Sequence, residues 1–107
     1  MPASTKRSMP FLTENDPSSC PVPRDRITSF LRAEAVPNRR LRDRDLAFVR
    51  TASFDDCRYW LWRFPMQDDD AYALVLADWE GEWLSWRASA KGASPEQVLL
   101  DDWKSGH

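Results

Sequence analysis

Three runs rich in aromatic and aliphatic residues constrain the fold of this chain more than any other feature. They cover residues 58–64, 71–79 and 82–88, and segments containing proline, aspartate and glycine separate them. The side chains in these runs suit a pleated, half-buried surface, and the separating residues are typical of turns. The sequence therefore predicts three antiparallel strands joined by hairpins.

The alternation of side chains along these strands predicts one strongly apolar face. We expect Phe64 to lie opposite Ala71 in the first hairpin, and Glu80-Gly81 to form the two-residue loop of the second, with Trp79 opposite Glu82. Large side chains then meet small ones across the strands, as close packing requires. This predicted core face consists of Trp60, Trp62, Phe64, Val75, Leu84 and Trp86.

The opposite face is too apolar to lie open to water, since the wet face of an antiparallel sheet normally alternates to polar residues. A helix of this chain, a second copy or a partner protein must cover its leucines, and the sequence leaves these three covers open. The face carries Tyr59, Leu61, Arg63, Tyr72, Leu74, Leu76, Trp83, Ser85 and Arg87.

Two helices are predicted on either side of the strands along the chain. Apolar residues at helical spacing indicate a helix over residues 24–35, with Asp25 as its N-cap. Near the C-terminus, Ser94, Pro95 and Gln97 form a capping-box pattern that starts a helix ending at about Lys104. The fold class is therefore α+β, with both helices packed on the sheet.

The remaining segments complete the predicted domain organisation. Residues 1–23 contain five prolines and few sizeable apolar side chains, so we expect a largely disordered arm there. Residues 24–107 form a single domain. The segment from Leu46 to Ala52 fits either helix or strand by its periodicity. We predict a strand, because Val49 and Thr51 are β-branched and a fourth strand completes the meander.

Charge is distributed unevenly, although the net charge is only -2. Residues 24–50 carry eight arginines against four acids, whereas residues 51–107 carry five basic groups against eleven acids. The two cysteines, Cys20 and Cys57, are expected as free thiols in a bacterial cytoplasm, and no apolar run is long enough to span a membrane.

The sequence offers no catalytic signature, and we expect no cofactor and no metal. Asp68, Asp69 and Asp70 lack the spacing of a calcium loop. The only histidine is His107, so Cys57 has no evident base. Acids near Trp79 and Trp83 suit sugar binding, but a polar hairpin tip explains them more simply.

An arginine cluster is the candidate for binding anions. It comprises Arg39, Arg40, Arg42 and Arg44 and could contact phosphate, although Asp43 and Asp45 are interleaved with it. No nucleic-acid-binding motif accompanies it, so pairing within the chain or a solvated surface explains the cluster better than nucleic acid does.

The predicted function is that of a small non-enzymatic interaction module. It would bind itself or a protein partner through the second sheet face, at Tyr59, Leu61, Arg63, Tyr72, Leu74, Leu76, Trp83 and Arg87. The alternative is a small-molecule-binding protein or enzyme with an aromatic-lined pocket between sheet and helices. Nucleic-acid binding through Arg39–Arg44 ranks third, and no membrane role is expected.

Overall fold

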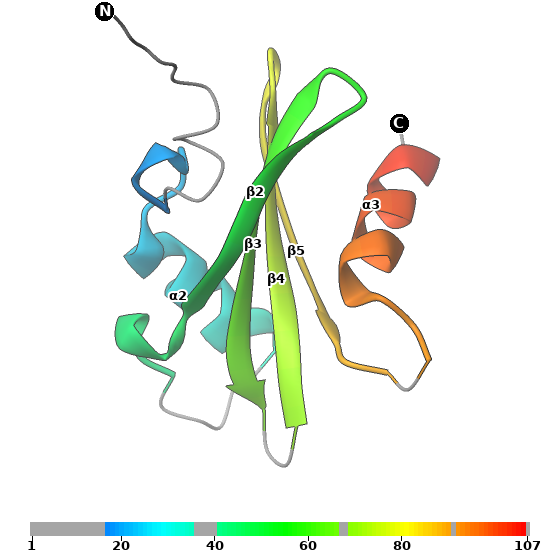
Figure 1. The fold of residues 1–107 in the computed structure, drawn as a ribbon. Coiled ribbons are helices and arrows are strands. Elements are labelled where there is room, and N and C mark those ends of the chain that lie inside the picture. Colours follow the sequence, from blue (N-terminus) through cyan, green and yellow to red (C-terminus); the bar gives the residue numbers. More distant parts are fainter. Residues whose placement is uncertain (1–16, 36–40, 67–68, 91, 107) are drawn as a thin grey trace, which may run out of the picture.

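A four-stranded antiparallel sheet lies between two helices, one on each of its faces (Figure 1). The computed structural model describes residues 17–35, 41–66, 69–90 and 92–106. The strands follow one another in chain order, so the sheet is a meander, and the predicted α+β class is confirmed. The elements are η1 (Pro17–Ser19), α2 (Arg24–Glu34), η2 (Asp43–Asp45), β2 (Ala47–Phe54), β3 (Cys57–Met66), β4 (Asp69–Asp78), β5 (Gly81–Ala88) and α3 (Pro95–Ser105).

The ambiguous segment before the aromatic strands is a strand, as predicted. It forms β2, which runs to Phe54 and pairs with β3 through a bulge between Phe48 and Arg50. The two residues of the β2–β3 turn, Asp55 and Asp56, both have positive φ, at 49° and 65°. Aspartate tolerates this left-handed conformation better than most residues, which is why a turn without glycine closes here.

The predicted register of the first hairpin is confirmed and that of the second is wrong by two residues. Phe64 lies opposite Ala71, but Asp78 pairs with Gly81, so the loop is Trp79-Glu80 and not Glu80-Gly81. The Asp78 carboxylate accepts hydrogen bonds from the amides of Glu80 (2.8 Å) and Gly81 (3.1 Å), which fixes the turn one position earlier. A two-residue shift keeps every side chain on its predicted face.

The predicted core face, here called face 1, is covered by α2 and by the chain segments on either side of it. The described segments supply Val22, Ile27 and Leu31, together with Leu41 and Leu46. The buried sheet residues beneath them are Trp60, Trp62, Phe64, Ala71, Ala73 and Val75, while Leu84 and Trp86 are only partly buried.

The opposite face, here called face 2, is covered by α3. Leu99, Leu100 and Trp103 of this helix pack on Tyr59, Leu61, Leu74, Leu76 and Cys57. Ser94 caps α3 as predicted, with its hydroxyl accepting from the Gln97 amide at 3.3 Å. The Gln97 side chain donates to Asp101 instead of completing the capping box.

The N-terminal boundary differs from the prediction. Part of the segment assigned to a disordered arm, residues 17–23, packs on the sheet, and its Val22 is buried. Residues 1–16 lie outside the described residues. Helix α2 begins at Arg24 with Pro23 as its N-cap residue, so Asp25 lies in the first turn and is not the cap.

Candidate functional site

Four apolar side chains at the centre of the predicted partner face are buried within this chain. Tyr59, Leu61, Leu74 and Leu76 are each no more than 3% exposed beneath α3. Of the other predicted residues on this face, Tyr72 and Trp83 are partly buried and only Arg63 and Arg87 are exposed. Of the three covers that the sequence left open for this face, the structure shows the first, a helix of this chain, because α3 supplies enough apolar surface to bury the leucines.

A polar network holds α3 against the sheet. The Glu96 carboxylate accepts hydrogen bonds from the Tyr59 hydroxyl and from Arg50, whose Nε lies 3.0 Å away. Burial and the hydrogen bond to Glu96 raise the pKa of Tyr59 from 10.0 to about 12. Two further ion pairs, Arg87 with Asp102 (3.0 Å) and Lys104 with Asp55 (3.4 Å), join the helix to β5 and to the β2–β3 turn.

The tip of the β4–β5 hairpin presents an exposed tryptophan. Trp79 is 91% exposed, far more than the only other large apolar residue that is exposed in the described part of the chain, Val49 at 39%. Its backbone position is fixed by the hydrogen bonds of Asp78 across the turn and by Gly81, whose φ is 146°. The ring is therefore displayed on an ordered turn rather than on a loose loop.

Beside Trp79 the hairpin borders a hollow of about 140 Å³. Its lining residues are Leu76, Asp78, Glu80, Gly81, Glu82, Trp83 and Trp103. Aromatic rings and carboxylates both attract cations, so this surface favours a basic group over an acidic one. The sequence placed these residues together at a hairpin tip, but it did not predict the contribution of Trp103 from α3.

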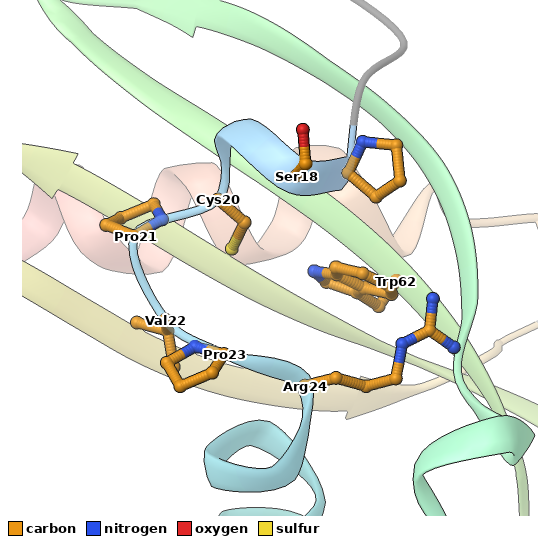
Figure 2. Close-up of a pocket in the computed structure, with 8 residues that line it drawn as sticks. Ser18, Cys20, Pro21, Val22, Pro23, Arg24 and Trp62 are labelled. Carbon is orange, nitrogen blue, oxygen red and sulfur yellow. The ribbon is translucent and has the colours of Figure 1, made fainter.

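On the other side of the sheet, a cavity of about 480 Å³ lies between β3 and the segment that enters α2 (Figure 2). The chain from Pro17 to Arg24 curves around the Trp62 side chain, with the Cys20 thiol directed toward the indole nitrogen. The Arg24 guanidinium lies over the Trp62 ring, 5.0 Å from its centroid. Arg24 also donates from one nitrogen to the carbonyls of Asp43 (3.1 Å) and Leu46 (2.8 Å).

The indole N–H of Trp62 makes no hydrogen bond of normal geometry among the described residues, although the residue is only 2% exposed, and the group it faces is the Cys20 thiol, a weak acceptor. A buried donor without a partner costs about 1 to 3 kcal/mol. The nearby Trp60 differs, because its indole N–H donates to the Ser19 hydroxyl at 2.8 Å. Burial raises the pKa of Cys20, and the Val22 amide and the Trp62 N–H offset this effect only in part.

The arginine cluster is only partly described. Arg42 and Arg44 line an open hollow of about 510 Å³ beside α2, where Arg32 is a third cation and Asp25 and Asp43 are acids. Arg32 donates to the Leu41 carbonyl at 2.6 Å, so part of the cationic surface is used within the chain. Arg39 and Arg40 lie outside the described residues.

Sequence reasoning missed the cavity beside Trp62 because its wall comes from the proline-rich segment expected to be disordered. The available signal was Val22, the one β-branched aliphatic residue of the first 23, placed between Pro21 and Pro23 immediately before the helix. A buried anchor at that position brings Cys20 and Arg24 onto the sheet.

No protein-family model matches the chain, and neither a curated protein nor a solved structure is significantly similar to it. Across the described ranges no helix is long and apolar enough to cross a membrane. Within these same ranges, no three side chains of His, Cys, Asp or Glu gather closely enough to hold a metal ion.

Proposed function

We propose that this protein is a non-enzymatic interaction module that binds a basic protein partner through the tip of its β4–β5 hairpin. The observation that carries this proposal is the exposure of Trp79 at 91% on a turn held by side-chain hydrogen bonds. Tryptophan is the residue type most enriched among interface residues that dominate binding energy. A tryptophan side chain that is 91% exposed contributes little to folding, so binding gives a physical reason for its position.

The charge around Trp79 supports a basic partner. Glu80 and Glu82 are exposed on the same hairpin, and Asp78, Trp83 and Trp103 join them around the neighbouring hollow. A lysine or arginine of the partner would contact aromatic rings and carboxylates together. The eleven acids of residues 51–107 against five basic groups would speed the encounter with a cationic surface.

This proposal moves the binding surface from the face predicted from sequence to the edge of that face. Trp83 and Arg87 remain near the surface, whereas the leucines beneath α3 are used for folding. The partner would therefore contact the hairpin and the exposed side of β5 without displacing α3.

The test is a quantitative capture experiment with matched variants. The tagged full-length protein, Trp79→Ala and Val49→Ala are each incubated with lysate of the source organism, with and without nuclease. We expect one nuclease-resistant basic protein to bind the wild type and Val49→Ala but not Trp79→Ala. The purified partner should then lose affinity for Trp79→Ala by at least about thirtyfold, since a central tryptophan contributes 2 kcal/mol or more.

Two results would count against the proposal. Equal recovery by the wild type and Trp79→Ala would show that the hairpin tip is not the binding surface. Recovery of nucleic acid that nuclease removes would instead favour the arginine cluster around Arg42 and Arg44.

A further inference from the structure

We propose that the cavity between β3 and residues 17–24 binds a small organic carboxylate, with Trp62 and Arg24 as the recognition residues. This site lies on face 1 and is independent of the hairpin tip on which the proposed interaction depends. Its volume of about 480 Å³ lies within the range typical of small-molecule sites.

The first argument is the unpartnered donor. Trp62 is 98% buried, its indole N–H makes no hydrogen bond of normal geometry among the described residues, and in Figure 2 its nitrogen points toward the Cys20 side of the cavity. The group it faces is the Cys20 thiol, and sulfur is a weak acceptor. A carboxylate oxygen that replaces the thiol would give this donor a stronger hydrogen bond.

The second argument is the charge at the cavity. Arg24 lies against the Trp62 ring and uses one of its terminal nitrogens for backbone carbonyls, which leaves the other side of the guanidinium for a ligand. Helix α2 is 11 residues long, begins at Arg24 and has no side-chain cap, so its partial positive charge is directed toward the same region. Two acids partly offset the positive charge of Arg24 and the helix N-terminus, namely Asp25 in the first turn and Glu82 of β5.

The walls define the rest of the ligand. Pro17, Pro21 and Pro23 line the cavity together with the Trp62 ring, and these surfaces are apolar and rigid. The ligand therefore combines one carboxylate with a compact apolar body, as in an aromatic or short-chain monocarboxylate. A rotation of the half-buried Cys20 side chain about its Cα–Cβ bond would clear the path to the indole N–H.

The test is an NMR titration of the ¹⁵N-labelled full-length protein with benzoate, in parallel with benzamide and inorganic phosphate. The chain has six tryptophans, and the indole signal missing from Trp62→Phe identifies Trp62. We expect this signal to shift and saturate with benzoate at a Kd below about 1 mM, and much less with benzamide. The signal of Trp60, already bonded to Ser19, should stay in place.

Three variants make the result specific. Trp62→Phe keeps an aromatic ring but removes the N–H, and should weaken benzoate binding about tenfold, whereas Trp79→Phe at the exposed hairpin tip should leave it unchanged. Cys20→Ala removes the competing thiol and should bind benzoate at least as tightly as the wild type, which tests the site even if Trp62→Phe does not fold. Arg24→Gln should abolish the preference for benzoate over benzamide.

The proposal is overturned if benzoate does not shift the Trp62 signal, or if Trp62→Phe binds benzoate as tightly as the wild type. A saturable shift caused by inorganic phosphate alone would also overturn it, because it would show a site for anions without an apolar component.

Discussion

The two faces of the sheet are closed in different ways, although β3 and β4 supply most of the side chains for both. Face 1 buries tryptophans beneath a cover built from residues 17–35 and 41–46, in several separate pieces. Face 2 buries mainly leucines beneath the single helix α3, which three ion pairs among the described residues join to the sheet and to the β2–β3 turn. The cover of face 2 is one continuous helix held by ion pairs, whereas the cover of face 1 consists of several separate segments.

The two faces also differ in how well their buried polar groups are hydrogen-bonded. On face 2, the buried hydroxyl of Tyr59 has a carboxylate partner in Glu96. On face 1, the indole N–H of Trp62 makes no hydrogen bond of normal geometry within the described part of the chain and faces only the Cys20 thiol beside the cavity. Natural cores satisfy nearly all buried donors, so the weakly bonded Trp62 N–H needs an explanation, and the ligand proposed for the cavity would supply one.

The largest expected effect comes from placing a charge in face 2. Leu74→Asp puts a carboxylate at a position that is 0% exposed beneath α3. We expect a loss of more than about 4 kcal/mol in the free energy of unfolding, which is most of the stability of a domain at the lower end of the usual range of about 5 to 15 kcal/mol. Circular dichroism and urea denaturation measure this directly. A folded Leu74→Asp that no longer associates with a partner would restore face 2 as a binding surface.

The second largest loss of stability is expected from truncation of Trp62, the central tryptophan of face 1. Trp62→Ala should cost about 3 to 5 kcal/mol, since a large buried ring is replaced by a methyl group. Trp62→Phe should reduce the free energy of unfolding by less, because the phenyl ring still fills most of the space and the substitution also removes the weakly bonded indole N–H. Chemical denaturation of both variants checks the pair. Equal losses would mean that the indole N–H is satisfied in solution.

The sequence predicted the features that depend on local patterns, such as the alternation of side chains along a strand and the capping residues of a helix. The faces of β3 and β4 followed from the period of two, and the start of α3 followed from Ser94 and Pro95. The sequence did not predict which segment covers which face. The packing of α3 on face 2, and of residues 17–23 on Trp62, depends on tertiary contacts that local patterns do not encode. The Trp79-Glu80 turn was missed because the side chain of Asp78 competed with the expected use of glycine.

The pH dependence of stability tests the Tyr59–Glu96 contact of face 2. Because the folded protein holds the Tyr59 proton more tightly than the unfolded chain, its pKa being raised from 10.0 to about 12, this contribution to stability is complete below pH 10 and is lost as pH rises toward 12. Tyr59→Phe should lower stability by about 1 kcal/mol at neutral pH and flatten this alkaline decline. Tyr72→Phe is the matched control. Parallel alkaline curves for the wild type and Tyr59→Phe would contradict the assignment.

The two thiols provide one probe for each face, with an effect on rate rather than on stability. Burial raises the pKa of Cys57, to which the charges of Asp78, Asp55 and Asp56 add, and burial likewise raises that of Cys20. Both should react slowly with iodoacetamide at neutral pH and faster as the pH rises above 9. Cys20 is less buried and should be alkylated first, as measured by mass spectrometry. Faster labelling of Cys57 would mean that the α3 side opens more readily than the N-terminal cover.

The smallest effect on stability is expected at the hairpin tip, outside both faces. Trp79→Ala removes a side chain that is 91% exposed, so the free energy of unfolding should change by no more than about 0.5 kcal/mol. Urea denaturation measures this change, with Val49→Ala as the control on the opposite edge strand. A neutral result shows that partner affinity lost in Trp79→Ala reflects the binding surface itself. A large destabilisation would instead show that Trp79 packs against this chain in solution, and the hairpin tip would then belong to the fold rather than to an interface.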